Sequence, residues 1–333
     1  MYPADRELRW QDGERLIRFG RSALADAPPL LAERGFDSYA LLTTERAAAA
    51  APVLAAGAVT AAHVPHGPVP EAAAAIRQAA GGRPLVALGG GRVIDAAKAV
   101  AAADGLPLAA VPTTLAGAEM NGHHRPLPGF EDAPRRRPVL VIADPSLMAS
   151  LPPAALTATA LNALAHAVEA LYTPSAGPLS EAAGLEAARQ LAHGLRTPDA
   201  AALSLGGLLA GYALGVAGFA VHHVLGQTLV RTAGTPHAET NAVLLPHVVA
   251  AMASRAPREI GLLGDALGRP GDAAGAVAEL AAGTDVHRLR DLGVTEDQLP
   301  AVADAAMRRR DELDRTPGGL SREDVLHLLH EAM

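Results

Sequence analysis

The chain has 333 residues, half of them hydrophobic, and its 28 basic and 35 acidic side chains give a net charge of −7. This charge argues against a nucleic acid or an anionic membrane as the partner and favours a small molecule. Cysteine is absent, which excludes disulfides, thiolate nucleophiles and cysteine-ligated metals. A bound metal would therefore need His, carboxylate or amide ligands. The length favours two domains over one.

The N-terminal residues do not resemble a secretory signal, because Asp5, Arg6, Glu7 and Arg9 interrupt the first ten positions with charge. The most apolar stretch spans residues 203–222. It contains five glycines, Gly206, Gly207, Gly211, Gly215 and Gly218, and this composition favours a closely packed buried helix over a lipid-facing one. We expect a soluble, cytoplasmic protein without a membrane partner.

In the first half of the chain, short apolar runs alternate with alanine-rich stretches, which predicts parallel strands joined by helical crossovers. The expected strands are residues 39–43, 59–64, 84–88, 108–111 and 139–142, and the expected helices are 45–56, 71–80 and 92–103. The sheet should therefore have at least five strands.

From Leu151 onward the β-branched runs fade and helical periodicity dominates. Pro152, Pro153 and Pro198 mark helix starts, and further prolines at 236, 246, 270 and 300 punctuate the remainder. We expect an α/β domain over residues 1–150 and an all-helical domain over residues 151–333.

A glycine turn, Gly89 to Gly91, links an expected strand to an expected helix. Such a turn lets the backbone approach a pyrophosphate at the helix N-terminus, although a tight turn with close packing explains the glycines equally well. Thr113 and Thr114 end the next strand, where open parallel sheets bind ligands, and together the two features favour a nucleotide site. Asp95 and Lys98 on the helix are expected to form a solvated ion pair.

Three histidine positions and one amide position in the helical half could converge on one pocket, the adjacent pair His222-His223 counting as one position. Asn162 and His166 share a helix face, His222 and His223 are expected to end the glycine-rich helix, and His237 follows. Imidazoles there could bind a metal or supply protons. The alternative is an ordinary structural role, which we assign to His63, His66, His123, His124, His193, His247, His287, His327 and His330. His66 and His123 remain lesser candidates because they lie in loops near the ligand edge of the sheet.

Five ordered motifs, at residues 89–98, 112–120, 143–145, 161–172 and 236–247, resemble the iron-containing alcohol dehydrogenase superfamily and, within it, the maleylacetate reductase branch. The resemblance runs from about Phe19 to residues 317–324. It implies the dehydroquinate synthase-like fold, in which a Rossmann-like nucleotide-binding domain (1–150) is followed by an all-helical substrate and catalytic domain (151–333). A nicotinamide cofactor is implied in the cleft between the domains, and a homodimer is implied as the assembly.

The resemblance also implies roles for cofactor-binding residues. Gly90, Gly91 and Arg92 would hold the pyrophosphate, Asp95 would support that loop or the ribose, and the adenine side would be lined by Thr113 and Thr114. Glu45 occupies the place of an acid that binds ribose hydroxyls and repels a 2′-phosphate. It favours NADH, with NADPH as the alternative.

The metal ligands of the metal-dependent members are Asp, His, His and His, at the positions of Asn162, His166, His223 and His237. The neutral amide of Asn162 weakens a site for divalent Fe or Zn, which agrees with a branch whose members resemble metal-independent enzymes. Gln227 stands where the family usually has a further histidine. Either that histidine is displaced or a proton donor has been lost.

We therefore predict an NAD(P)-dependent, metal-independent reductase that transfers hydride to an activated C=C or C=O of a small carboxylated substrate. The catalytic residues would be His166, His223, His237 and Asn162, placed around the developing oxyanion. Basic residues of the loop, Arg125 and Arg135–Arg137, could neutralise a substrate carboxylate, but we favour a solvated loop. The alternatives are a metal-dependent alcohol dehydrogenase and a redox-inactive homologue that acts as a lyase, a cyclase or a cofactor-binding protein in a biosynthetic pathway.

Overall fold

The computed structural model describes residues 1–333 and divides them into two compact units. The N-terminal unit comprises residues 3–150 and 200–208, and the C-terminal unit comprises residues 1–2, 151–199 and 209–333. The long division falls at Ser150 and Leu151. Residues 200–208 pack instead with the N-terminal unit, where Gly207 lies so close to Leu115 that an added Cβ atom would be 3.2 Å from the Leu115 Cα.

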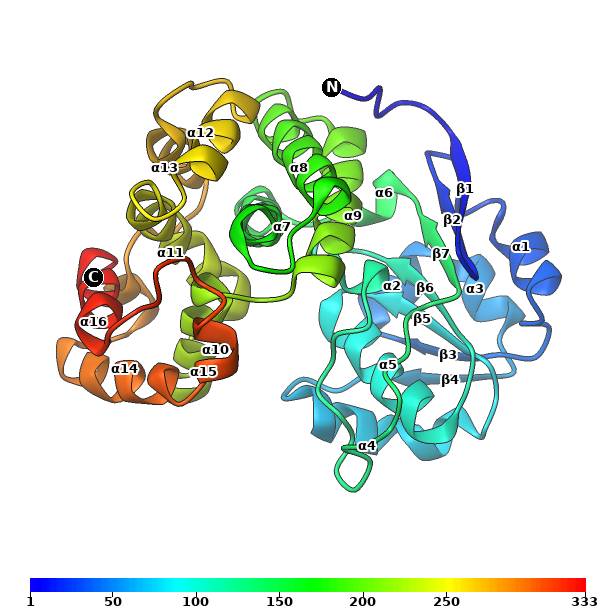
Figure 1. Cartoon of the computed structure of the whole chain (residues 1–333). Coiled ribbons are helices and arrows are strands. Elements are labelled where there is room, and N and C mark those ends of the chain that lie inside the picture. The colour runs from blue at the N-terminus through cyan, green and yellow to red at the C-terminus, as the bar shows by residue number, and fades with distance from the viewer. The chain divides into compact units, whose positions relative to one another are not determined.

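The N-terminal unit is built on a seven-stranded sheet in the order β1-β2-β7-β6-β5-β3-β4 (Figure 1). The strands are β1 (Leu8–Asp12), β2 (Arg15–Phe19), β3 (Ala40–Thr43), β4 (Thr60–His63), β5 (Leu85–Gly89), β6 (Leu108–Pro112) and β7 (Leu140–Ala143). Only β1 and β2 pair antiparallel; every other pair is parallel. All seven strands are thus held in one sheet, in which the five predicted parallel strands lie side by side from β7 to the edge strand β4.

Helices cover both faces of the sheet. They are α1 (Ala27–Glu33), α2 (Glu45–Ala50), α3 (Pro52–Gly57), α4 (Val69–Ala80), α5 (Gly91–Asp104), α6 (Pro145–Met148) and the 3-10 turn η1 (Ala118–Met120). Leu85 and Ala87 of β5 pack with α4 and α5, whereas Val86 and Leu88 pack with the cluster that contains α1, α2, α3 and α6. Because successive strand residues face opposite sides, β5 is apolar throughout and buried on both faces.

Two sequence predictions for this unit differ from the structure. The hairpin β1–β2 was not predicted, because its outer strand alternates half-buried and exposed residues and carries charge. The predicted helix over residues 45–56 is divided into α2 and α3 at Pro52, which cannot donate a backbone hydrogen bond and begins the second helix.

The C-terminal unit is helical. Its helices are α7 (Pro153–Tyr172), α8 (Pro178–Arg196), α9 (Ala200–Ala217, shared between the units), α10 (Val221–Ala233), α11 (His237–Met252), α12 (Pro257–Ala266), α13 (Ala273–Ala281), α14 (Leu299–Met307), α15 (Arg310–Leu313) and α16 (Arg322–Glu331), with 3-10 turns η2 (Leu289–Leu292) and η3 (Glu296–Gln298). The central helix is α7, which packs against α8, α10, α11, α12 and α13. Pro246 lies inside α11 rather than between elements.

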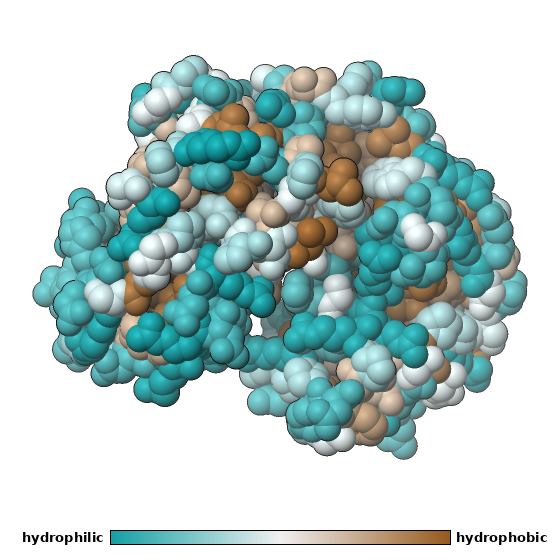
Figure 2. Space-filling view, in the orientation of Figure 1, coloured by the Kyte–Doolittle hydropathy of each residue, from teal (hydrophilic) through white to brown (hydrophobic).

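Two helices, α7 and α9, are long and apolar enough to span a membrane by length and composition alone. In the fold, however, 78% and 72% of their apolar windows are buried, as in the core helices of globular proteins. Figure 2 shows a surface on which hydrophilic side chains predominate and apolar ones form small separate groups. Burial therefore accounts for the apolar character of both helices.

Candidate active site

The glycine turn lies where β5 ends and α5 begins. Gly90 is the N-cap of α5 and no side chain caps this helix, so its first N–H groups are available to an anion. Neighbouring side chains crowd the turn: a Cβ atom on Gly90 would lie 2.9 Å from Thr114 Cγ2, and one on Gly91 would lie 3.1 Å from Ala116 Cβ. The backbone thus forms a narrow cradle that fits a pyrophosphate.

The other expected cofactor-binding residues gather at the same edge of the sheet. Thr113 follows β6 and donates its backbone N–H to Gly89 O at 3.0 Å, while its buried Oγ1 has no hydrogen-bond partner. Glu45 begins α2 directly after β3, the other neighbour of β5. Arg92 approaches His66, with 3.3 Å between Nη1 and Nδ1. The carboxyl ends of β6, β5 and β3 therefore assemble one candidate dinucleotide site.

Lys98 differs from its prediction, because its side chain is completely buried rather than solvated. Its ammonium group donates to the carbonyl oxygens of Ala118, Asn121 and His123 at 2.9, 3.3 and 2.6 Å, and lies 2.7 Å from Asp95 Oδ1. Lys98 thereby holds the segment that follows Thr114. Asp95 pairs with the buried Lys98 ammonium group, and only 30% of the Asp95 side chain is exposed.

Sequence reasoning missed a buried acid in this segment. Glu119 is 1% exposed, and its Oε1 has no hydrogen-bond partner. Burial raises the pKa of Glu119 to about 7, although the nearby charges of Lys98 and Arg15 oppose the shift. The only signal in the sequence was an acid between apolar neighbours in the motif at residues 112–120.

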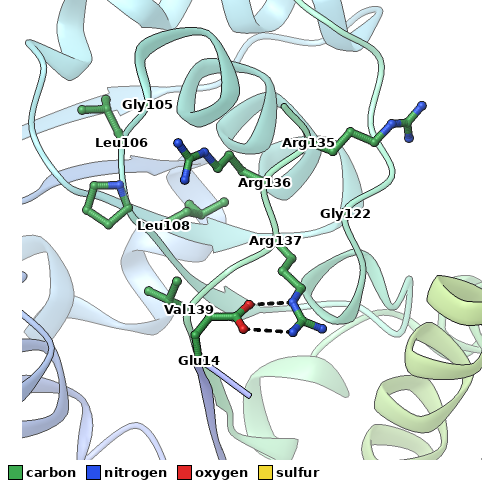
Figure 3. Close-up of a pocket in the computed structure, with 10 residues that line it drawn as sticks. Glu14, Gly105, Leu106, Leu108, Gly122, Arg135, Arg136, Arg137 and Val139 are labelled. Carbon is green, nitrogen blue, oxygen red and sulfur yellow. Dashed lines mark hydrogen bonds and ion pairs between the residues drawn. The ribbon is translucent and has the colours of Figure 1, made fainter. Parts of the chain in front are cut away.

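Three arginines of the loop, Arg135, Arg136 and Arg137, line a cavity of about 600 Å³ at the opposite, amino-terminal edge of the sheet, beside the starts of β6 and β7 (Figure 3). Arg137 forms two hydrogen bonds with Glu14, of 2.8 and 3.2 Å, and Arg135 contacts His123. Arg136 points into the cavity. These three residues therefore do not lie at the glycine turn, and Arg137 is paired rather than simply solvated.

The predicted histidines meet in the C-terminal unit. Asn162 and His166 lie on α7 and are 4% and 5% exposed, whereas His237 begins α11 and is exposed. His223 lies in the first turn of α10 rather than at the end of the glycine-rich helix, because α9 already ends at Ala217. Its ring stacks on that of His166, with 4.5 Å between the centroids. Three helices thus bring the four predicted residues into one unit.

A buried carboxyl group that sequence reasoning missed supports this cluster. Glu169 is 0% exposed, and its Oε2 lies 2.6 Å from His223 Nδ1 while its Oε1 accepts the His223 backbone N–H. Burial raises the pKa of Glu169 to about 7 and lowers the pKa of His223. It also lowers the pKa of the adjacent His222 to about 3. The environment therefore favours neutral imidazoles, and His223 Nε2 is buried without a hydrogen-bond partner.

A second missed residue, Asn241, lies one turn beyond His237 on α11. Its Nδ2 lies 2.6 Å from Asn162 Oδ1 and 3.1 Å from His237 Nε2. Its spacing from His237 places it on the same helix face, which was the available sequence signal.

The donor set does not fit a divalent cation well. The Oδ1 of Asn162, which replaces the metal-binding carboxylate of the family, already accepts a hydrogen bond, and the Glu169 carboxyl is directed at His223. The structure contains no group of three or more His, Cys, Asp or Glu side chains arranged to hold a metal ion.

Gln227, the residue in place of the further histidine, is held by Arg309. The Arg309 Nη2 donates to Gln227 Oε1 at 2.9 Å, and the same guanidinium forms hydrogen bonds of 2.8 and 2.6 Å with Glu312. A neutral amide clamped in this way cannot act as the proton donor that a histidine would be.

Comparison with known proteins agrees with this arrangement. The model of the iron-containing alcohol dehydrogenase family matches residues 15–124, and that of the family's C-terminal domain matches residues 156–333. The chain belongs to the iron-containing alcohol dehydrogenase family. It is accordingly an NAD(P)-dependent oxidoreductase, as the motifs predicted.

Relatives of the chain include maleylacetate reductases, the predicted branch. The chain is 37% identical to the maleylacetate reductase of Pseudomonas knackmussii over 95% of both chains. The crystal structure of maleylacetate reductase from Rhizobium sp. strain MTP-10005 superposes with a TM-score of 0.84, at 28% identity, and covers 98% of both chains. A 1,3-propanediol oxidoreductase superposes with a TM-score of 0.82, at 25% identity, over 98% of this chain and 99% of the other. The predicted family and fold are therefore confirmed.

Proposed function

We propose that this protein is an NADH-dependent reductase of the maleylacetate reductase type, which reduces an activated C=C or C=O of a small carboxylated substrate. When bound, the nicotinamide cofactor supplies the hydride. The N-terminal unit would hold it through Gly90, Gly91 and Arg92, with Thr113 and Thr114 beside the adenine. Glu45 would bind the ribose hydroxyls and disfavour a 2′-phosphate, so that NADH is preferred to NADPH.

The histidine cluster of the C-terminal unit would donate a hydrogen bond to the developing oxyanion, and the proton that completes the reduction would enter from solvent. His237 is the exposed member and would contact the oxygen on which negative charge develops, while His166 and His223 form the buried wall behind it. Hydride and proton together complete the addition across the double bond. The observation that carries this proposal is the carboxyl–imidazole pair Glu169–His223, because the buried carboxyl group fixes the orientation of one imidazole of the cluster.

We further propose that the reaction needs no metal, since Asn162 offers a neutral oxygen that already accepts a hydrogen bond from Asn241. The protein would act in the cytoplasm as a homodimer.

The test measures oxidation of NADH by purified protein with maleylacetate and related small enones and aldehydes. We expect turnover that survives a chelator, in protein whose metal content is far below stoichiometric, and we expect His237→Ala to lower kcat/KM by about 10²- to 10⁴-fold. A matched change at an exposed histidine distant in sequence, His327→Ala, should leave turnover unaltered.

Other outcomes would identify the alternatives. Stoichiometric metal together with loss of turnover to the chelator would show a metal-dependent alcohol dehydrogenase. Binding of NADH without oxidation by any of these acceptors would refute the reductase proposal and favour a redox-inactive member, which the neutral Gln227 in place of a histidine would explain.

A further inference from the structure

Asn241 is fully buried, on the second turn of α11, although it lies next to an exposed histidine. Its amide nitrogen has two neighbours that are not consecutive in the chain: Asn162 Oδ1 on α7 at 2.6 Å and His237 Nε2 at 3.1 Å. One NH₂ group thus joins two of the four positions that the family uses at its catalytic centre.

The chemistry of the three groups determines which of them donates. An amide NH₂ has two protons and no acceptor capacity, whereas the Asn162 carbonyl oxygen can only accept. A ring nitrogen that accepts from an NH₂ group must be unprotonated, so the proton of neutral His237 lies on Nδ1. We propose that Asn241 is a positioning residue that fixes this tautomer and the orientation of the His237 ring.

The opposite orientation of the Asn241 amide would change two side chains at once. It would place Asn241 Oδ1 against Asn162 Oδ1 and His237 Nε2. The Asn162 amide would then have to rotate so that its NH₂ group faces Asn241. In the observed orientation Oδ1 lies against α10 at Gly226, where a Cβ atom would be only 2.2 Å from it. The Asn241 amide therefore fits between α10 and α11 because residue 226 is glycine.

This inference rests on the proposed function in one respect. If His237 donates to the developing oxyanion, it must do so from Nδ1, because Nε2 is occupied by Asn241. Loss of Asn241 would then affect turnover through His237 rather than through binding of the dinucleotide, for which we assign residues of the other unit.

The first test needs neither substrate nor turnover. In protein labelled with ¹⁵N-histidine, long-range ¹H–¹⁵N correlation spectra distinguish the two neutral tautomers, and the His237 signals are assigned by their loss in His237→Ala. We expect the Nδ1–H tautomer in the wild type, and a shift of population toward Nε2–H in Asn241→Ala and in the near-isosteric Asn241→Asp, whose carboxylate accepts where the amide donated. A wild-type His237 protonated on Nε2 would overturn the proposal whether or not either variant folds.

The second test is kinetic. Asn241→Ala and Asn241→Asp should each lower kcat by about 10- to 100-fold, with little change in the KM for NADH. The control is Thr240→Ala, which removes a buried hydroxyl from the same turn of α11 and its bond to Pro236 O but leaves the amide in place. An equal loss of kcat in the control would show a merely structural role and overturn the proposal. If the wild type shows the expected His237 tautomer but reduces no acceptor, the proposed function is contradicted and the positioning role of Asn241 is not.

Discussion

Glu119 gives the sharpest quantitative prediction, because it is a carboxyl group buried without a compensating hydrogen bond at Oε1. Its pKa is raised from 4.5 to about 7 in the folded protein. Between these values the folded state binds a proton that the unfolded state has released, so the free energy of unfolding falls as pH rises. A difference of about 2.5 pKa units corresponds to about 3 kcal/mol.

Replacing Glu119 by Gln keeps the shape of the protonated acid and removes its titration. The variant should be nearly as stable as the wild type at pH 4.5, and its relative stability should grow by about 3 kcal/mol by pH 8. Urea unfolding followed by fluorescence measures this, because Trp10, the single tryptophan, lies in β1 of the same unit. Glu71→Gln, at an exposed position on α4, is the control. A stability difference independent of pH would refute the assigned burial and protonation of Glu119.

Three further changes test other parts of the structure. Glu169→Gln, which removes the acid paired with His223, should lower kcat by about 10- to 100-fold in the NADH assay, and unchanged turnover would contradict the role of the pair. Gly90→Ala places a Cβ atom 2.9 Å from a threonine methyl group and should weaken NADH binding about tenfold by titration calorimetry, whereas Gly261→Ala, where a Cβ atom would meet nothing within 4 Å, should not. Lys98→Met leaves three carbonyl oxygens without their donor and should reduce the free energy of unfolding by about 3–5 kcal/mol. Urea unfolding measures this change. An unchanged midpoint would show that the buried ammonium group does not stabilise the fold.

The sequence was informative about cofactor-binding residues because local patterns determine them. A glycine run after an apolar strand, and hydroxyls after the next strand, place Gly90 and Thr113 at one edge of the sheet once the strands are parallel. The buried state of Lys98, by contrast, depends on packing. For a lysine three residues from an aspartate, surface and interior ion pairs have the same sequence pattern.

The helical unit shows the same limit at the candidate site. Spacing along one helix related Asn162 to His166, and motif order indicated His223 and His237, so four site residues were predicted from the chain alone. Glu169 and Asn241 were not, although each lies on a helix already singled out. Their importance comes from which atoms they meet across helices, and no periodicity within one helix contains that information.

By itself, therefore, the sequence determined the family, the succession of an α/β half by a helical half, the absence of thiol chemistry, and the replacement of a metal-binding carboxylate by an amide. Only the tertiary structure decided what that amide does. The oxygen of Asn162 is engaged by a nitrogen 79 positions later in the chain, and the free energies of buried polar groups depend on such long-range partners rather than on residue type.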